Sequence, residues 1–367
     1  MNLIKPMRAL GLTSVSSFDE VELSLISTDG IDVYDFLVHR KVPYGEVLQE
    51  KLRKITENGM NIEENASFIS EVDAEVTEFY IEIIKDFMDV HGTDIDVIGF
   101  EGMILCHKPS ECHTQQIGSP KKIAEALGIK VVGNFHKADI LSGGQGYPLT
   151  PSYYMALTSE VEKPAAVVNI SEISAITWLG SHGEMTAFDC GPGTSAINEW
   201  VYKKANMNMD YNGKLAITGK IDGKILSSLM KHKYLALYPP KSMEKNIFVE
   251  KLEHLEGLSL EDGAATVTAF VAEAISYSLL LFVPEIPTRI MLCGGGAKNP
   301  TLVRFIRQRL PDIRVLIPSE VEMNVDSIDA GCAGFLAVRR LNMLPISFPS
   351  TTGVPEPLIG GEVFEGL

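Results

Sequence analysis

The chain has 367 residues, enough for two domains, and with 45% hydrophobic and 22% charged residues it has an ordinary globular composition. Its formal net charge of −16 argues against nucleic-acid binding, which requires a basic face to neutralise phosphates. Five scattered cysteines without a CxxC pair indicate neither a disulfide framework nor a zinc cluster, and no stretch reads as a signal peptide or a membrane span. We therefore expect a cytoplasmic protein with reduced thiols.

The N-terminal part predicts three strands and then alternating helices and strands. The longest helix carries an apolar stripe with acidic residues opposite, and Asn65 or Ser67 is its expected cap. In chain order we predict strands at 7–12, 21–27 and 31–38, helices at 45–57 and 67–90, a strand at 96–100, a helix at 120–127 and a strand at 129–132.

The second half repeats this order. We predict strands at 165–170, 175–179 and 184–188, helices at 194–203 and 261–282, a strand at 289–292, a helix at 300–310, a strand at 313–317 and a helix at 326–340. Since the order of elements repeats but the residues do not, we predict two α/β domains of related plan with a cleft between them. The glycine- and proline-rich segment Gly143–Pro151 is the expected crossing point.

Glycines lie between a predicted strand and a predicted helix in FDCGPGTSAINEW, residues 188–200. Gly191 and Gly193 would let backbone N–H groups approach an anion at the helix N-terminus. Asp189, at the strand end, is a candidate general base or Mg²⁺ ligand. The alternative is an ordinary turn in which Asp189 caps the helix.

A glycine triplet follows a predicted buried strand in MLCGGGAKNP, residues 291–300. Three glycines leave a bare backbone surface that a flat ring or a phosphate can approach, which favours a ligand surface over a flexible loop. Asn299 and Pro300 are expected to open the next helix.

Other polar stretches are less specific. LSGGQGYPLTP, which contains Gln145, is as consistent with a linker as with a site, and helix capping explains Asp326 and Asp329 adequately. His107 and His113 lack metal-ligand spacing, and neither a P-loop nor an early GxGxxG is present.

Together the motifs resemble those of the anhydro-N-acetylmuramic acid kinases, in the actin, Hsp70 and sugar-kinase superfamily. FDCGPGTS resembles their DTGPGN, LCGGGAKNP their CGGGxxNP, and VVGNFHKADILSGGQGYPLTP their VxDFRxxDxxxGGQGAPLxP. TQQIGS, NISEISAI, DSIDAG and the closing FPSTTGVPEPLIGGEVF also have counterparts in the same order. The resemblance implies two actin-like (ribonuclease H-like) α/β domains with an active-site cleft between them, at 1–140 joined by 342–367 and at 141–341.

The resemblance also implies an activity. Such an enzyme would phosphorylate 1,6-anhydro-N-acetylmuramic acid with ATP and add water across the anhydro bridge, giving N-acetylmuramic acid 6-phosphate in cell-wall recycling. Mg²⁺ would arrive mainly with ATP, near Asp19 or Asp189. Family members are dimers, so a homodimer is implied, without a nucleic-acid or membrane partner.

Site residues follow from the matching positions. Asp189 would be the base that activates water. The ATP phosphates would meet Ser14, Ser16, Ser17, Asp19, Gly191 and Gly193, the adenosine would meet Gly294, Gly295, Gly296 and Asn299, and the sugar would meet His136, Gly143, Gly144, Gln145, Asn169 and Asp329.

Departures from the family pattern gather in these motifs. The family's MSGTSLDG is TSVSSFDE here, so that Val15 and Glu20 replace both glycines. HGQT becomes EGMI (101–104), DFR becomes NFH (134–136) and NIGG becomes NISE (169–172). Three changes add a carboxylate, and like charges about 5 Å apart repel by roughly 3 kcal/mol. We therefore expect slow turnover, with a catalytically degraded relative that acts as a binding or regulatory protein as the alternative.

Overall fold

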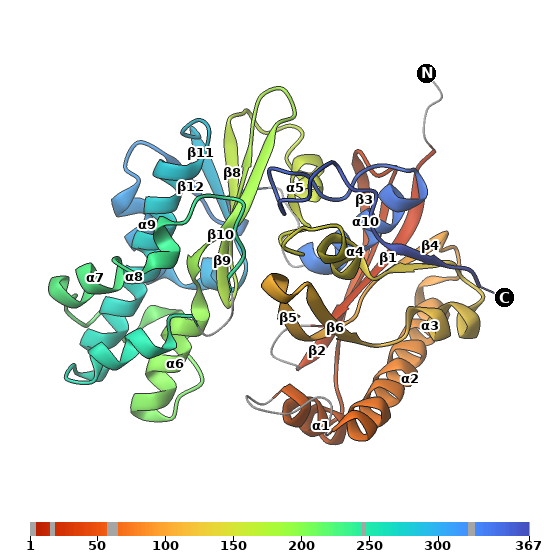
Figure 1. Ribbon diagram of the computed structural model, residues 1–367, viewed down its shortest axis with the longest axis horizontal. Helices are drawn as coiled ribbons and strands as arrows, with labels where there is room; N and C mark the ends of the chain where they lie inside the picture. Colours follow the sequence, from red (N-terminus) through yellow and green to blue (C-terminus); the bar gives the residue numbers. More distant parts are fainter. Residues whose placement is uncertain (1–4, 15–18, 57–64, 244–246, 322–326, 367) are drawn as a thin grey trace. The chain divides into compact units, whose positions relative to one another are not determined.

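The computed structural model describes residues 5–14, 19–56, 65–243, 247–321 and 327–366. Its contacts divide the chain into two compact units, drawn in Figure 1. Unit 1 contains residues 1–159, 326–349 and 354–367, and unit 2 contains residues 160–325 and 350–353.

Unit 1 is built on a six-stranded mixed sheet in the order β13-β7-β4-β1-β2-β3. The first three strands form an antiparallel meander, β4 and β7 extend the sheet in parallel from β1, and β13 closes it antiparallel to β7. The strands are β1 (Met7–Ser14), β2 (Glu20–Thr28), β3 (Val33–Pro43), β4 (Val97–Glu101), β7 (Val131–Gly133) and β13 (Glu362–Phe364).

Over the described part of unit 1, six α-helices and a separate hairpin accompany the sheet. Most of the predicted apolar stripe of α2 packs into the sheet core, through Val72, Val76, Ile83 and Phe87, whereas Val90 at its end is exposed. The elements are α1 (Glu46–Thr56), α2 (Ala66–His91), α3 (Pro120–Leu127), α4 (Phe135–Leu141), α5 (Pro151–Leu157), α10 (Ile328–Leu341), and the hairpin β5 (Met103–Lys108) with β6 (His113–Ile117).

Unit 2 has a five-stranded mixed sheet in the order β10-β9-β8-β11-β12. Its strands are β8 (Ala165–Ile170), β9 (Ile173–Leu179), β10 (Met185–Pro192), β11 (Arg289–Cys293) and β12 (Arg314–Leu316). Its helices are α6 (Thr194–Ala205), α7 (Gly223–Leu229), α8 (Leu260–Phe282) and α9 (Pro300–Arg309). Short 3-10 helices lie at η1 (Pro109–Glu111), η2 (Tyr211–Gly213), η3 (Lys233–Ala236), η4 (Val249–Leu255), η5 (Gly295–Lys298) and η6 (Pro318–Glu320).

Helix α8 explains the most apolar stretch of the chain. Within the described residues it is the one helix long and apolar enough to cross a membrane, and 78% of its most apolar window is buried. Its buried side chains, Val267 and Ile275 among them, belong to the hydrophobic core of unit 2. The stretch is therefore accounted for as a core helix.

The two sheets share one strand order. In each, the third, second, first, fourth and fifth sheet strands lie side by side, if β13 is set apart as an addition. This confirms the predicted α/β class and the two copies of one plan. The hairpin β5–β6, the short helices α4 and α5, and β13 were not predicted.

The compact units divide the chain differently from the predicted domains. The segment Gly143–Pro151 lies within unit 1, and the chain passes to unit 2 after Ser159. Helix α10 also belongs to unit 1. The predicted limits at 140/141 and 341/342 came from the family resemblance, and as domain limits they stay a prediction.

Candidate active site

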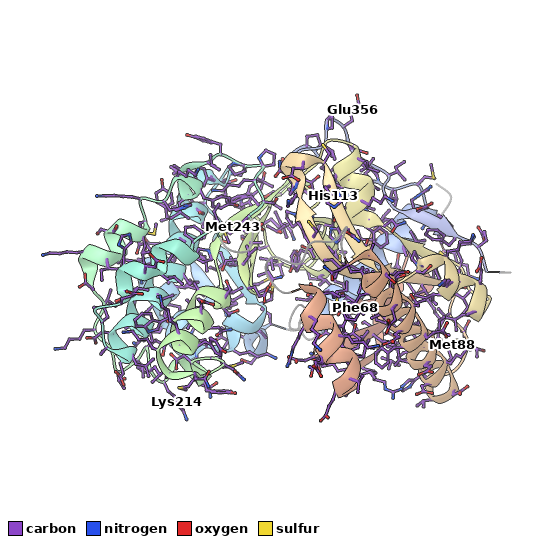
Figure 2. The ribbon with its side chains drawn as sticks, turned by 60° about the horizontal axis from the view of Figure 1, so that its bottom comes forward. Phe68, Met88, His113, Lys214, Met243 and Glu356 are labelled. Atoms are coloured by element: carbon purple, nitrogen blue, oxygen red, sulfur yellow. The ribbon has the colours of Figure 1, made fainter. Side chains whose placement is uncertain are left out.

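Asp189 lies in β10 of unit 2 and is 8% exposed. Its Oδ2 accepts a hydrogen bond of 2.7 Å from the backbone N–H of Met243, which is labelled in Figure 2. Its own N–H donates to the Lys241 carbonyl at 3.0 Å, and its carbonyl accepts from the Tyr234 hydroxyl at 2.9 Å. The segment around Lys241 therefore fixes both the backbone and the carboxyl group of Asp189.

Burial dominates the electrostatics of this carboxyl group. It raises the pKa of Asp189 to about 7, against the opposing effects of the Met243 N–H and the Lys241 charge. A carboxyl group with a pKa near neutrality can take up and release a proton at physiological pH, as a general base must. The alternative prediction, that Asp189 caps α6, is wrong, because the cap position is Gly193 and no side chain caps the helix.

Lys241 is a buried cation beside Asp189, and it is 5% exposed. Its ammonium group donates to the Tyr234 carbonyl at 3.3 Å and lies 4.6 Å from the centroid of the Phe282 ring. Burial lowers the pKa of Lys241 to about 8. The sequence carried no signal for this arrangement, because a lysine in a loop is ordinarily exposed.

The turn after β10 brings the predicted phosphate glycines against the end of β8. A Cβ at Gly193 would overlap the Ser171 carbonyl oxygen, so this position requires glycine for packing. The Gly193 N–H donates to the Glu172 carbonyl at 2.9 Å, and the Thr194 N–H donates to the Ser171 carbonyl at 2.8 Å. These two amides are already used within the turn. A Cβ at Gly191 would lie 2.9 Å from Ala274 Cβ.

The glycine triplet lies at the end of β11, against β8. Gly294 has a φ of +76°, and a Cβ there would overlap the Oδ1 atom of Asn169. A Cβ at Gly296 would overlap Ile170. Gly295 is exposed, and no atom lies within 4 Å of the place where its Cβ would be. Of the triplet, only the backbone at Gly295 is therefore open, and its role as a ligand surface stays a prediction.

Asn299 and Asn169 both lie near this triplet. Asn299 caps α9, since its Oδ1 accepts from the N–H groups of Thr301 and Leu302 at 3.1 Å each, which confirms the predicted helix start. Asn169 pairs with Cys293 across the β8–β11 ladder, and its Oδ1 accepts from Ser171. The structure therefore groups Asn169 with the predicted adenosine residues of unit 2, whereas the other predicted sugar residues belong to unit 1.

A pocket of about 320 Å³ adjoins α6 in unit 2. Its lining includes Glu172, Ser195, Asn198, Met243 and Phe248. Met243 thus lines this pocket, and its backbone N–H donates to the Asp189 carboxylate. Part of the wall, including Ser195 and Asn198, comes from the motif at 188–200, whereas Met243 and Phe248 come from a segment that no motif marked.

In unit 1, the loop that carries Gln145 is anchored by side chains of two elements, α4 and β5. Asp139 Oδ1 accepts from the Gly146 N–H at 2.7 Å, and a Cβ at Gly144 would overlap the same carboxylate. His107 Nε2 lies 3.0 Å from the Gln145 carbonyl oxygen. Gly143 lies in the left-handed region, with a φ of +89°.

His136, another of the predicted sugar residues, is only 2% exposed. Its Nδ1 lies 2.7 Å from the Gly146 carbonyl oxygen, and its Nε2 lies 2.7 Å from Glu101 Oε1. The Tyr147 ring stacks on the imidazole with 4.1 Å between centroids. His136 therefore ties β4, α4 and the Gln145 loop together.

The predicted phosphate hairpin is described only in part, because Val15, Ser16 and Ser17 lie outside the described residues. Ser14 Oγ accepts from the Tyr44 hydroxyl at 3.0 Å. Asp19 Oδ1 accepts from the Gln49 amide at 2.6 Å and lies 3.3 Å from the Arg53 guanidinium. The phosphate role of this hairpin stays a prediction.

Two of the three added carboxylates are paired with cations. Glu20 Oε1 lies 2.7 Å from Lys41 Nζ, and Glu101 is bonded to His136. Glu172, the third, lines the pocket of unit 2. Lys41 is also paired with Glu22, so one cation is shared by two carboxylates and offsets the charge of Glu20 only in part.

The remaining candidates are less enclosed. Asp329 lies in the first turn of α10, where burial of its carboxyl group and then the charges of Glu101 and Glu22 raise its pKa to about 7. Asp326 lies outside the described residues. His113 is exposed on β6. Over the described ranges, no three or more His, Cys, Asp or Glu side chains come together in a way that could hold a metal ion.

Comparisons with known proteins cover nearly the whole chain. The family model described as anhydro-N-acetylmuramic acid kinase matches residues 7–366. The anhydro-N-acetylmuramic acid kinase of Rhizorhabdus wittichii is 36% identical over 364 residues, which are 97% of this chain and 98% of that one. The enzyme of the same name from Zymomonas mobilis is 36% identical over 366 residues, 97% and 99% of the two chains. Among solved structures, the activator of 2-hydroxyisocaproyl-CoA dehydratase from Clostridium difficile covers 92% of this chain and 96% of its own, at 13% identity and a TM-score of 0.42, too low to support an argument.

Proposed function

The chain belongs to the anhydro-N-acetylmuramic acid kinase family, and from that membership we propose how its residues divide the reaction. The protein is an ATP-dependent anhydro-N-acetylmuramic acid kinase that serves peptidoglycan recycling. Neither the family match nor the curated relatives support the reduced activity expected from the altered motifs. No observation favours the alternative of a non-catalytic binding protein.

We propose that Asp189 is the general base for the opening of the anhydro ring. It would take a proton from the water whose oxygen bonds to the anomeric carbon C1, while the bond between C1 and O6 breaks. The freed O6 would bond to the γ-phosphorus of ATP as ADP leaves, giving N-acetylmuramic acid 6-phosphate, and the proton on Asp189 would pass to solvent. The observation that carries this assignment is the burial of Asp189, which brings its pKa to about 7.

Two surfaces of unit 2 are proposed for ATP. The open backbone at Gly295, with its neighbours Gly294 and Gly296, would receive the adenosine, and Asn299 would contribute through its amide nitrogen while its oxygen caps α9. The turn at Gly191 would approach the phosphates. Because the Gly193 N–H is bonded to Glu172, Gly193 would shape this turn and not donate to a phosphate.

The sugar is proposed to meet the loop of unit 1 that carries Gln145. Its anchoring by Asp139, His107 and His136 supports this role, since a ligand-binding loop gains affinity when it is held in place before binding. Asp329, Gly143 and Gly144 would also contact the sugar. Asn169 would instead support the glycine triplet proposed for the adenosine, since it lies beside Gly294.

Three further proposals rest on family membership. Mg²⁺ would be brought with ATP, where it neutralises phosphate charge. Asp19 fits a metal poorly on its own, because its Oδ1 already contacts Gln49 and Arg53. We also propose a homodimer and a cytoplasmic location, and sedimentation of the purified protein would test the first.

The Asp189→Asn variant tests the proposed function. We expect kcat for ADP release with 1,6-anhydro-N-acetylmuramic acid to fall by roughly 10²–10⁴-fold, the usual contribution of a general base. The affinity for ATP, measured by calorimetry, should stay close to that of the wild type. Asp222→Asn is the matched control, because Asp222 only caps α7. A kcat within a few-fold of the control would remove Asp189 from the reaction.

A further inference from the structure

The two nitrogens of His136 constrain the protons around them. Nδ1 lies 2.7 Å from the Gly146 carbonyl oxygen, which can only accept a hydrogen bond, so Nδ1 carries a proton. Nε2 lies 2.7 Å from Glu101 Oε1, and this contact requires a second proton between the two atoms. His136 and Glu101 therefore hold one proton more than a neutral imidazole and an ionised carboxylate do.

Burial and charge act in opposite directions on this pair. Burial of the imidazole disfavours its charged form, but the Glu101 charge, the hydrogen bond to Glu101 and the Gly146 carbonyl outweigh burial and raise the pKa of His136. Glu101 is 22% exposed at its side chain, and its second oxygen is not used by His136. The extra proton is thus held where the Gln145 loop meets β4.

A second histidine, His107, contacts the carbonyl of Gln145, next to Gly146, and it is neutral where His136 is charged. His107 Nε2 lies 3.0 Å from the Gln145 carbonyl oxygen, and within the described parts of the chain its buried Nδ1 has no hydrogen-bond partner. Burial, and then the charge of His136, lowers the pKa of His107 to about 4. His107 is therefore neutral, donates from Nε2, and does not titrate near neutral pH.

The other groups around His136 are accounted for. Asp139, on the same helix, accepts from the Gly146 N–H, and its charge also favours the imidazolium. The Tyr147 ring covers one face of the imidazole and also contacts His107 edge-on at 4.8 Å. Glu101 from β4, Asp139 from α4, His107 from β5 and Tyr147 from the loop are the titratable groups that act on or contact His136. On the other side of the pair, the Glu101 charge raises the pKa of Asp329 and of Cys332, both in α10.

We propose that Glu101 and His136 form a positioning pair whose shared extra proton fixes the Gln145 loop, so that sugar affinity falls with rising pH while the chemical step does not depend on this pair. The inference rests on the proposed sugar role of the loop and adds the regulation of that site. It assigns Glu101, one of the carboxylates that depart from the family pattern, a function in this chain.

The pH dependence follows from the hydrogen-bond count. Both bonds are complete below the ordinary histidine value of 6.5, and one is lost as the pH rises through the raised pKa of His136. A neutral imidazole has only one N–H, so its other nitrogen faces either the Gly146 carbonyl oxygen or the Glu101 carboxylate with a lone pair, and that contact is repulsive. The loop loses one of its anchors, and the sugar must order it on binding.

Steady-state kinetics from about pH 6 to about pH 9 test the pair. In the wild type we expect KM for 1,6-anhydro-N-acetylmuramic acid to rise roughly tenfold over this range, as for the loss of one charge-assisted hydrogen bond. KM for ATP should change little. Lys241 has a pKa of about 8 and can make kcat vary with pH for a separate reason. Burial and then the Glu101 charge raise the pKa of Asp329, a proposed sugar contact, to about 7, so the same profile is measured in Asp329→Asn, which should keep the alkaline rise in sugar KM if the pair causes it.

The Glu101→Gln variant tests most directly whether the extra proton causes the pH dependence of sugar KM. A glutamine amide can donate to Nε2 of a neutral His136 while Nδ1–H still donates to Gly146, so both bonds form without the extra proton. We expect its sugar KM to be nearly constant over the same pH range. His113→Gln is the matched control, since His113 is an exposed histidine of the neighbouring hairpin, labelled in Figure 2, and it should keep the wild-type profile.

Two results would overturn the pair: a wild-type sugar KM that does not change with pH, or an alkaline rise in Glu101→Gln equal to that of the wild type. Calorimetry of sugar binding to the full-length protein distinguishes a failure of the proposed pair from a failure of the proposed function. A wild type that binds the sugar with a pH-independent Kd contradicts only the pair. A wild type that binds no sugar at any pH contradicts the proposed function and the pair together.

Discussion

Asp189 in unit 2 and His136 in unit 1 are both nearly buried ionisable side chains, yet their partners differ. Asp189 has one backbone N–H on its carboxylate, and the nearby Lys241 ammonium is bonded to the Tyr234 carbonyl. His136 has an acceptor on each nitrogen, one of them a carboxylate. Burial therefore dominates at Asp189 and raises its pKa, whereas direct partners dominate at His136 and keep it protonated.

This difference separates two uses of a buried charge. A group whose charged form is poorly compensated exchanges its proton near neutral pH, which suits chemistry. A group whose charged form is fully bonded holds its proton to a higher pH than usual and fixes its neighbours while it does so, which suits binding. On this view unit 2 supplies a base that titrates and unit 1 supplies an anchored loop. The following variants test each side of that comparison.

The largest expected effect is on the thermal stability of the Asp189→Asn variant at alkaline pH. In the folded protein the pKa of Asp189 is about 7, whereas its ordinary value is 3.8. The free energy of unfolding therefore falls as the pH rises from about 3.8 to about 7, because the buried carboxyl group must then ionise. At one pKa unit per 1.36 kcal/mol, the full cost above pH 7 is about 4 kcal/mol. Asp189→Asn should therefore unfold at a higher temperature than the wild type at alkaline pH, while losing turnover.

Calorimetric melting at several pH values measures this effect. The gap in Tm between Asp189→Asn and the wild type should be small near pH 4 and should grow up to about pH 7. Asp222→Asn, which keeps a good capping residue at the start of α7, should leave Tm nearly unchanged at every pH. A gap that does not change with pH would mean that burial does not set the proton affinity of Asp189.

Lys241→Met tests whether the neighbouring cation keeps Asp189 usable as a base. The methionine stem can still pack against the rings, but the charge that lowers the pKa of Asp189 is gone. We expect the acid limb of the kcat profile to move up by about one pH unit, with about a tenfold lower kcat on that limb. The control is Lys233→Met, at an exposed lysine of η3. An unmoved acid limb would show that the cation does not act on Asp189.

Asp139→Ala tests the other side of the comparison. It removes the acceptor of the Gly146 N–H and leaves that buried amide unpaired, so the Gln145 loop should loosen. We expect the sugar KM to rise about tenfold, with KM for ATP and kcat nearly unchanged. Asp139→Asn keeps an oxygen at the same place and should stay within a few-fold of the wild type. Equal losses in both variants would point to a general folding defect.

The sequence supported more of the fold than of the domain limits. Helices and strands followed from apolar periodicity, but the place of α10 did not. A Cβ at Gly11 would overlap the Ala330 carbonyl oxygen, and a Cβ at Gly99 would overlap that of Ala333, so α10 packs directly on β1 and β4 of unit 1. That contact joins residues more than two hundred positions apart, and no local pattern predicts it.

The candidate site shows the same limit. The motif around Asp189 identified the residue, but its burial depends on Lys241 and Met243, which the sequence marked in no way. The altered motifs at Glu101 and His136 were visible as two separate departures. Only the folded chain brings them within 2.7 Å, where one change provides the partner for the other.

The smallest effect is expected at Glu20. The like-charge argument predicts that Glu20→Gln should tighten ATP binding, whereas the structure places Lys41 Nζ 2.7 Å from the Glu20 carboxylate. Both side chains are partly exposed, and an exposed ion pair contributes at most about 1 kcal/mol. We therefore expect Glu20→Gln to change the calorimetric Kd for ATP by less than about threefold, with little change in Tm. An affinity gain of tenfold or more would mean that Lys41 does not neutralise Glu20 toward the nucleotide, and that charge at this hairpin does limit ATP binding.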